Sequence, residues 1–228
     1  MREQDEWSVK PIAYIQTDFK EKFGIPRQSG RAKLLGKVVF LPEYARKEAF
    51  RALDGFSHVW LLFDFSKAHK AEWSATVRPP RLGGNTRVGV FASRSPFRPN
   101  PIGLSCVKLI KIEFTPTGVS LIVEGADLLD GTPSLDVKPY LPHADCVLDA
   151  VGGYADERKN YRLQVEFPTA LLERIEEEKR AGLIECLADD PRPSYQDDGR
   201  EYGMRFAEYN LRFQVKGDTL IVLSVEEV

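Results

Sequence analysis

Short apolar segments separated by glycine and proline make up most of the chain between residues 7 and 151. They include residues 11–15, 37–41, 58–63 and 119–123. Alternation in the last of these predicts a strand with one buried face, whereas the continuously apolar residues 59–63 predict a strand buried on both faces. Apolar residues recur at helical spacing over 43–53, before Gly55, which predicts one helix. Many strands with few helices favour a barrel or a sandwich.

The pattern changes after residue 154. A polar segment at 156–161 precedes residues 169–187, whose leucines and isoleucines form one helical stripe opposite a charged, solvated face. Three further strands are expected at 202–206, 210–215 and 220–225. The sequence therefore predicts two domains, a mainly β domain over residues 1–155 and a small α+β domain over residues 156–228.

Composition narrows the class of protein. The 228 residues are 43% hydrophobic and 29% charged, with no apolar run near the roughly 20 residues of a membrane span and no leader-like start. We expect a cytoplasmic protein with no membrane partner. The cysteines and histidines lack metal-ligand or disulfide-framework spacing, so no metal site is expected and the cysteines are most simply small buried side chains: Cys106, Cys146, Cys186, His58, His69 and His143.

Charge is distributed unevenly along the chain. The net charge is −2, yet the stretch from Arg78 to Lys111 contains no acid and seven basic residues: Arg78, Arg81, Arg87, Arg94, Arg98, Lys108 and Lys111. A local basic surface on an otherwise neutral body indicates an anionic partner that is bound regionally.

Two loops combine these charges with rigid backbone. In the first, Pro26 fixes the chain before Arg27 and Gln28, whose planar donors suit a carboxylate, a phosphate or a base edge. In the second, Arg94 and Arg98 lie among prolines, a combination that suits a phosphate backbone beside a stacked base. No dinucleotide-binding glycine fingerprint and no P-loop occurs in the sequence.

Two further loops carry acids. Asp136, Lys138 and Tyr140 alternate along a short predicted strand, which would place an acid, a base and a phenol on one face. Residues 190–193 have the composition of a rigid turn, and the residues alone do not decide its role. The residues by themselves therefore predict a basic, rigid-loop site for an anionic aromatic ligand and leave the reaction open.

Several long motifs together resemble one known family, TsaA/TrmO. They are Pro26-Arg-Gln, Gly55-Phe-Ser-His-Val-Trp60, Val90-Phe-Ala-Ser-Arg-Ser-Pro-Phe-Arg-Pro-Asn-Pro-Ile-Gly103, Asp130-Gly-Thr-Pro and Asp190-Pro-Arg-Pro, in family order. The family comprises β-barrel tRNA methyltransferases. The resemblance implies a mostly β fold, with a single-sheeted β-barrel N-terminal domain and a small α+β C-terminal domain, and a homodimer.

The resemblance also implies a cofactor, S-adenosylmethionine, and a substrate. The substrate would be tRNA carrying threonylcarbamoyladenosine immediately 3′ of the anticodon, methylated at N6. Carried over position by position, the cofactor-binding residues would be Pro26, Arg27, Gln28, Ser66, Lys67, Arg94, Gly125, Ser134, Leu135, Asp136 and Val137. Ser66 and Lys67 lie in a stretch that matches the family only loosely.

Roles in RNA binding and proton transfer follow from chemistry within that framework. A basic and aromatic set would contact the RNA: Arg78, Arg81, Arg87, Phe97 and Arg98. Asp136 and Tyr140 are the candidates for assisting loss of the N6 proton. Two alternatives stay open, a non-catalytic tRNA-binding protein and a methyltransferase for another small anionic substrate.

Overall fold

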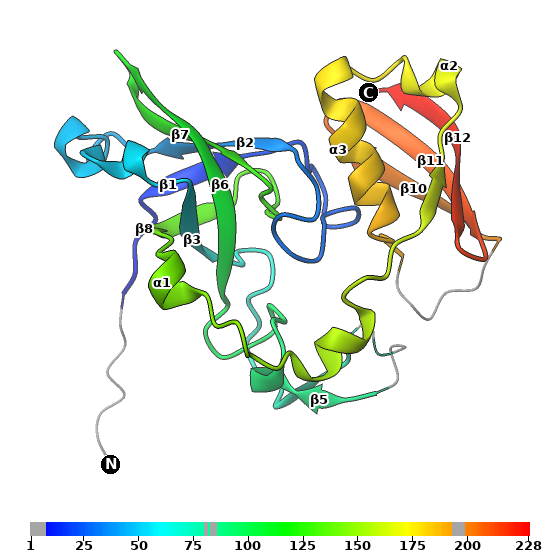
Figure 1. Ribbon diagram of the computed structural model, residues 1–228, viewed down its shortest axis with the longest axis horizontal. Coiled ribbons are helices and arrows are strands. Elements are labelled where there is room, and N and C mark those ends of the chain that lie inside the picture. Colours follow the sequence, from blue (N-terminus) through cyan, green and yellow to red (C-terminus); the bar gives the residue numbers. More distant parts are fainter. Residues whose placement is uncertain (1–7, 80–81, 83–85, 193–198) are drawn as a thin grey trace.

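The computed structural model describes residues 8–79, 82, 86–192 and 199–228, which form two adjoining bodies (Figure 1). The first is a closed barrel in the order β1-β2-β7-β6-β3-β8, in which neighbouring strands are antiparallel. Its strands are β1 (Ala13–Gln16), β2 (Leu35–Phe40), β3 (His58–Asp64), β6 (Ile102–Thr115), β7 (Gly118–Glu124) and β8 (Pro133–Pro139). The expected mostly β fold with a single-sheeted barrel is confirmed.

Alternation along the strands fills the barrel. In β3, Val59, Leu61 and Phe63 are buried, whereas Trp60 and Leu62 are only half-buried. The prediction that this strand is buried on both faces was therefore wrong, because the outer face of a closed sheet meets solvent unless something packs on it. Trp60 and Leu62 on the outer face of β3 are also apolar, so the central part of this strand does not alternate between apolar and polar residues although its burial does.

The connections divide between the two ends of the barrel. β1, β7 and β3 finish at the end where β2, β8 and β6 begin, so residues 17–34, 65–101 and 125–132 all leave from one end. We call this the loop end. The connection 65–101 includes the two-stranded ribbon of β4 (Thr76–Val77) and β5 (Val88–Gly89), followed by the turn η4 (Val90–Ala92).

Residues 43–53 lie at the opposite end of the barrel, and the prediction that they form a helix was wrong. The segment contains only two short 3-10 turns, η1 (Lys47–Phe50) and η2 (Leu53–Gly55). Ala52 between them has a left-handed backbone, with φ of 66°, which no continuous α-helix tolerates. The apolar spacing instead serves packing on the barrel, since the ring of Phe50 lies edge-on to Phe40 at 4.7 Å.

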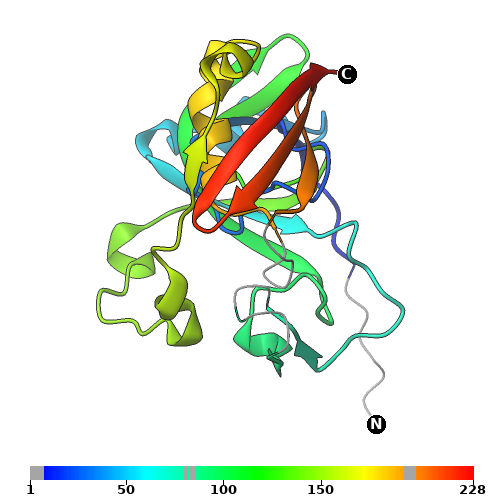
Figure 2. The ribbon, with the colours of Figure 1, turned by 90° about the vertical axis from the view of Figure 1, so that its right-hand side faces the viewer.

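The C-terminal body is a four-stranded sheet in the order β10-β11-β12-β9 with a helix beside it (Figure 2). Its elements are α2 (Thr169–Leu172), α3 (Glu177–Ala188), β9 (Gln164–Glu166), β10 (Glu201–Phe206), β11 (Tyr209–Lys216) and β12 (Thr219–Glu227). The three predicted strands are confirmed. The single predicted helix over 169–187 is two helices, because Glu176 is extended, with ψ of 133°.

A polypeptide segment joins α1 (Pro142–Asp145) near the barrel to the C-terminal body. The predicted domain boundary at residue 155 falls inside its short turn η5 (Gly153–Arg158) and stays a prediction. Of the cysteines, Cys186 is buried as expected, but Cys146 is exposed and Cys106 half-buried, and all three are free thiols. Among the described residues, no helix is both long and apolar enough to cross a bilayer.

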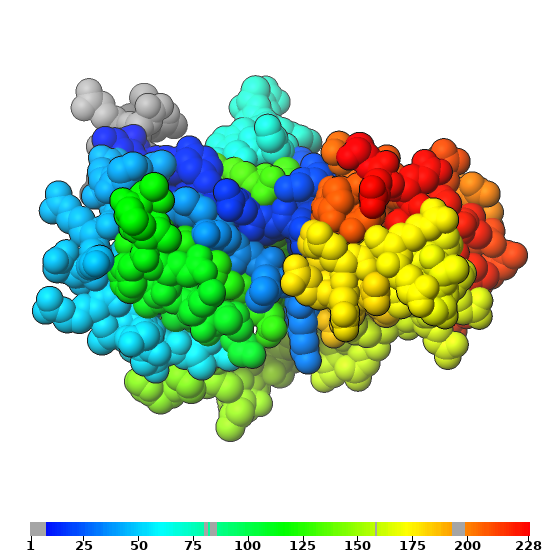
Figure 3. Space-filling view, turned by 90° about the horizontal axis from the view of Figure 1, so that it is seen from above, coloured from blue at the N-terminus to red at the C-terminus, as the bar shows by residue number. Residues whose placement is uncertain are grey.

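The β1–β2 connection binds the two bodies together. Seen from above, this blue segment lies between the barrel and the C-terminal body (Figure 3). Phe19, Ala32 and Leu34 belong to the hydrophobic core of the C-terminal body, and Phe23 stacks on Phe213 at 6.2 Å. The β1–β2 connection thus contributes side chains to the core of the C-terminal body, while the barrel strands enclose a separate core of their own.

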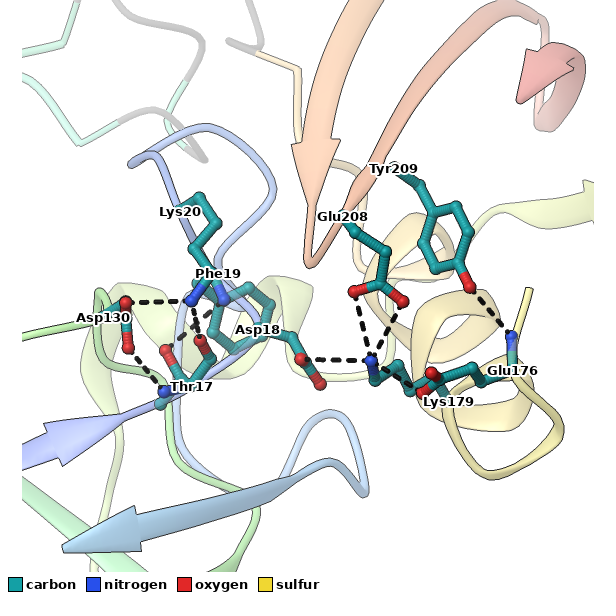
Figure 4. Close-up of polar contacts among 9 residues, drawn as sticks. All are labelled: Thr17, Asp18, Phe19, Lys20, Asp130, Glu176, Lys179, Glu208 and Tyr209. Carbon is teal, nitrogen blue, oxygen red and sulfur yellow. Dashed lines mark hydrogen bonds and ion pairs between the residues drawn. The ribbon is translucent and has the colours of Figure 1, made fainter. Parts of the chain in front are cut away.

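Polar contacts also anchor the start of the β1–β2 connection (Figure 4). Lys179 on α3 lies 2.8 Å from a carboxylate oxygen of Glu176, 3.2 Å from Glu208 and 3.8 Å from Asp18 in the β1–β2 connection. Asp130 accepts hydrogen bonds from the backbone of Thr17 and from Lys20, both at 2.9 Å. These contacts hold the start of the connection, residues 17–20, between the barrel and the C-terminal body.

Candidate functional site

The site begins where the β1–β2 connection passes β7. Gly125, at the end of β7, has φ of +87°, and its carbonyl accepts a hydrogen bond from the backbone N–H of Gly30 at 2.8 Å. A Cβ at Gly125 would lie 3.1 Å from Cα of Gly30, closer than side chains normally approach a backbone. Both the left-handed conformation and the close approach require glycine here. This contact places Pro26, Arg27 and Gln28 beside the end of β7.

The β3–β6 connection meets the same loop. Arg94 is exposed, and its guanidinium donates a 2.7 Å hydrogen bond to the side-chain oxygen of Gln28. Two predicted cofactor residues that are far apart in sequence are therefore in direct contact at the loop end. The side-chain amide of Gln28 carries no charge, so this hydrogen bond does not neutralise the positive charge of Arg94.

A half-buried carboxylate, Asp127, lies near this pair. Asp127 accepts a 2.5 Å hydrogen bond from the Ser105 hydroxyl. Burial raises the pKa of Asp127, and the Ser105 hydrogen bond and the charge of Arg94 oppose that rise. Sequence reasoning did not select either residue, although Asp127 follows Gly125 so closely that the glycine could have pointed to it.

The predicted residues Ser66 and Lys67 lie just beyond β3, also at the loop end. The carbonyl of Lys67 accepts a 2.8 Å hydrogen bond from Lys22 of the β1–β2 connection. Ser134 pairs with Phe63 at the end of the same strand, and its buried hydroxyl has no hydrogen-bond partner among the described residues. These residues form a second group at the loop end, and no hydrogen bond or ion pair among the described residues joins them to Arg94.

Arg27 is directed toward the C-terminal body. Its guanidinium donates to the carbonyl of Arg192 at 2.7 Å, and its backbone N–H donates to a carboxylate oxygen of Asp189 at 3.1 Å. Asp189 also pairs with Arg31 at 2.7 Å and is almost fully buried. The Asp190-Pro-Arg192 turn therefore has a structural role: its carbonyl groups accept hydrogen bonds from Arg27 and so hold the loop that carries Pro26, Arg27 and Gln28.

Asp136 lies farther along β8, and Tyr140 directly follows the end of that strand. Asp136 is paired with Lys138 at 2.7 Å on the outer face and lines a hollow of about 620 Å³ at the end of the barrel opposite the loops. Because a strand rises about 3.3 Å per residue, Tyr140 lies roughly 20 Å along the chain from the start of β8. Leu135 and Val137 share this strand. The structure of one chain does not bring these residues to Arg94.

Tyr140 belongs to a separate cluster. Its ring lies 5.7 Å from that of Trp60, and the Trp60 indole donates to Asp145 at 3.0 Å. Burial, followed by the neighbouring groups of Cys146, Cys106 and Asp145, raises the pKa of Tyr140. The phenol is therefore protonated near neutral pH and would act as a hydrogen-bond donor. Roles for Asp136 and Tyr140 in catalysis stay predictions.

The residues predicted to bind RNA differ in their exposure and in the contacts that their side chains make. Arg78 is exposed, whereas Arg98 donates to the Ser93 carbonyl at 3.2 Å and so braces its own loop. Arg87 donates to the Thr76 hydroxyl at 2.8 Å across the β4–β5 ribbon. Lys70 lies over the Phe97 ring at 4.2 Å, and Arg81 falls outside the described residues.

Known proteins share this arrangement. The sequence profile of the tRNA-methyltransferase O N-terminal domain matches residues 14–146, and that of the TrmO C-terminal domain matches residues 160–228. The chain belongs to the TrmO family. The resemblance stated from the sequence motifs is thereby confirmed.

Individual TrmO relatives match over almost their whole length. A protein of Escherichia coli K12 named tRNA (adenine(37)-N6)-methyltransferase is 41% identical, covering 96% of this chain and 98% of its own. A Pseudomonas aeruginosa protein named putative S-adenosylmethionine-dependent methyltransferase RcsF is 44% identical, covering 96% and 97%. The crystal structure of TrmO from P. aeruginosa superposes with a TM-score of 0.81 at 37% identity, covering 100% of both chains.

Proposed function

We propose that this chain is an S-adenosylmethionine-dependent methyltransferase acting on N6 of the tRNA adenosine immediately 3′ of the anticodon, and that its substrate there is threonylcarbamoyladenosine. The observation that carries the proposal is the contact of Arg94 with Gln28 beside Gly125, at the loop end of a TrmO-family barrel. Relatives of nearly full length bear the names of that activity and of that cofactor.

The residues at the loop end fit the proposed cofactor. S-adenosylmethionine carries a carboxylate, an ammonium group, ribose hydroxyls and an adenine ring. Arg94 offers a cation for the carboxylate, Gln28 offers an amide, and the glycine at 125 allows backbone groups to approach closely. The unpartnered buried hydroxyl of Ser134 supports its place in the same set. When bound, the cofactor supplies a methyl group on a positively charged sulfur.

Methyl transfer needs the N6 nitrogen held close to and in line with that carbon, so positioning supplies much of the catalysis. The nitrogen of threonylcarbamoyladenosine is a weak nucleophile, since its lone pair is delocalised into the purine and the carbonyl. A group that accepts or polarises its proton would help. Asp136 is the carboxylate that we propose for this, and Tyr140 would contribute a hydrogen bond.

The threonyl group adds a carboxylate that an arginine can recognise, which would make the earlier modification a requirement. Arg78 and Arg87 lie on the surface of the β3–β6 connection, where they suit tRNA phosphates or this carboxylate. An anticodon loop is single-stranded, so little base-pairing energy is lost when its bases are bound. We expect the enzyme to act in the cytoplasm, where its tRNA is found.

We also propose that the chain works as a homodimer. The outer face of β6 carries the exposed apolar side chains of Ile102, Leu104 and Ile110, which a second copy would cover. Within one chain Asp136 and Tyr140 are remote from Arg94, so a second copy is one way to complete the site. Analytical ultracentrifugation would give the oligomeric state directly.

The deciding experiment uses two tRNA pools, one with and one without the threonylcarbamoyl modification. Incubation with radiolabelled S-adenosylmethionine should label only the modified pool, and digestion should place the label on N6 of the nucleoside 3′ of the anticodon. Equal labelling of both pools would contradict the substrate. Absence of cofactor binding by calorimetry, together with retained tRNA binding, would favour a non-catalytic tRNA-binding protein.

A further inference from the structure

Two large aromatic rings are exposed side by side on the β3–β6 connection. Trp73 is 54% exposed and Phe91 is 74% exposed, and their ring centroids are 6.2 Å apart with 31° between the planes. Neither ring belongs to the cores of the barrel or the C-terminal body. Packing of the described residues therefore gives no reason for this pair, and exposed aromatic pairs of this kind mark binding surfaces.

The backbone beneath Phe91 is held from several sides. The β4–β5 ribbon leads into η4, where Val90 is buried and its N–H donates to the Ala75 carbonyl at 2.9 Å. The Tyr154 hydroxyl donates to the Ala92 carbonyl at 2.8 Å. With both neighbours of Phe91 fixed, its exposed ring is presented outward by a defined turn. Trp73 lies where the chain enters the same ribbon.

The charges around the pair suit a nucleic acid. Arg78 and Arg87 belong to the ribbon or its edges, Arg94 follows η4, and the sequence from 78 to 111 has no acid, although Glu72 is adjacent to Trp73. Flat apolar rings within basic surroundings match unpaired bases joined by phosphates. A protein partner would not need the cations, so the charge favours RNA.

We propose that Trp73 and Phe91 form a stacking platform for an unpaired base of the tRNA anticodon loop. The identity of the RNA rests on the proposed function, whereas the platform itself requires only single-stranded RNA. This assigns stacking to a pair of rings that sequence reasoning did not select. Phe97, which it did select, is less exposed, at 40%, and has the Lys70 ammonium over its ring.

The test measures binding of a synthetic anticodon stem-loop to Trp73→Ala and Phe91→Ala, and of the same stem-loop with abasic loop nucleotides. Loss of one stacked base should weaken binding of the intact stem-loop on the order of 10-fold for either variant. The abasic RNA, which keeps every phosphate, should bind weakly to the wild type and show no further loss. Trp73→Phe should restore most of the affinity.

A matched control is Phe114→Ala, since Phe114 is 47% exposed but lies at the far end of β6. It should bind RNA as the wild type does. Calorimetry should show unchanged S-adenosylmethionine affinity in both platform variants, and melting curves should show that they are folded.

Three results would overturn the platform. Equal weakening for intact and abasic RNA would mean that the rings act only through phosphate contacts, and unchanged RNA binding would remove the role altogether. A changed sedimentation coefficient with unchanged RNA affinity would identify a protein interface. Failure of the wild type to methylate tRNA, with the predicted losses of RNA binding intact, would reject the proposed function and leave the platform standing.

Discussion

Arg94 is the residue on which the proposed site depends most directly. Replacing it with alanine removes the exposed cation and the 2.7 Å hydrogen bond to Gln28. We expect kcat/KM for tRNA methylation to fall at least about 10-fold, because the proposed charge-assisted contact to the cofactor carboxylate would be lost.

Lys111→Ala is the matched control for that change. Lys111 belongs to the same basic stretch of sequence, but it lies on β6 and pairs with Glu113 at 2.8 Å. Its loss should leave methylation nearly unchanged. Comparable losses in the two variants would mean that the basic stretch acts only as diffuse charge.

Glu113 gives a pH-dependent prediction that concerns stability and not activity. Hydrogen bonds from Lys111 and then Lys37 lower the pKa of Glu113 to about 2. Because the folded-state pKa is below that of the unfolded chain, this carboxylate stabilises the fold above the unfolded pKa, and the effect is lost as pH falls through the folded pKa. Glu113→Gln should therefore lower Tm slightly near pH 7, by no more than about 2 °C for so exposed a group.

The difference in Tm between Glu113→Gln and the wild type should shrink as the pH falls from about 4.5 to 2. Thermal melts across that interval measure it. The control is Glu226→Gln on β12, because Glu226 forms no ion pair with the described part of the chain. A difference that stays constant through the interval would show that the ion pair is not its cause.

At the scale of elements, the β1–β2 connection decides the geometry of the site. The carboxylate of Asp189, which is buried on the C-terminal body, accepts a hydrogen bond from the backbone N–H of Arg27 and forms an ion pair with the side chain of Arg31, both in this connection. Asp189→Asn keeps the size but removes the charge, so Arg31 loses its ion pair and the loop loosens. We expect S-adenosylmethionine binding to weaken about 10-fold, in line with loss of a hydrogen bond to a charged group.

Glu185→Gln is a control within the same contact. Its carboxylate accepts the backbone N–H of Lys33 at 2.6 Å, farther along the connection and away from Arg27. Calorimetry should show little change in cofactor affinity for this variant. If both variants weaken binding equally, the effect is general loosening of the interface and Asp189 has no particular role.

The elements also show what could be predicted from sequence. Strands with one buried face, such as β7 and β11, follow from two-residue alternation, and the glycine and proline positions mark where they end. The helix predicted at 43–53 failed because local spacing carries no information about the left-handed backbone at Ala52, which tertiary packing imposes. The break at Glu176 is of the same kind.

Parts of the site divide in the same way. Arg94 could be found from the resemblance because it stands in the long motif of residues 90–103, and Gly125 was carried over from the family by its position. The contact between Arg94 and Gln28 could not, because it depends on three connections meeting at one end of a barrel whose strand order the sequence does not state. The role of Asp189 could not be predicted for the same reason, because it contacts a loop more than 150 residues away in the sequence.

At the scale of the whole molecule, the packing of the β1–β2 connection into the core of the C-terminal body predicts that the two bodies unfold together. Phe19 packs edge-on to Phe206 at 6.2 Å, and Leu34 belongs to the same core as Leu187. Separate unfolding would expose these side chains to water, at a free-energy cost of about 25 cal/mol per Å² of apolar surface. Disruption of the C-terminal core should therefore also destabilise the barrel.

The sequence supplies two separate probes of that coupling. Trp60 on β3 and Trp73 in the β3–β6 connection make tryptophan fluorescence a probe of the barrel side, whereas α3, the longest helix among the described residues, belongs to the C-terminal body and contributes to circular dichroism at 222 nm. Leu187→Ala opens a cavity in the C-terminal core, which costs about 2–5 kcal/mol. We expect both probes to shift to lower Tm together, by about 5–15 °C.

Leu121→Ala, in the barrel core, should shift both signals in the same way. A variant in which the 222 nm signal melts first, while tryptophan fluorescence keeps the wild-type Tm, would show that the bodies are independent. In that case the C-terminal body could not stabilise the loop that carries Arg27 and Gln28, because its contacts would be lost without effect on the barrel.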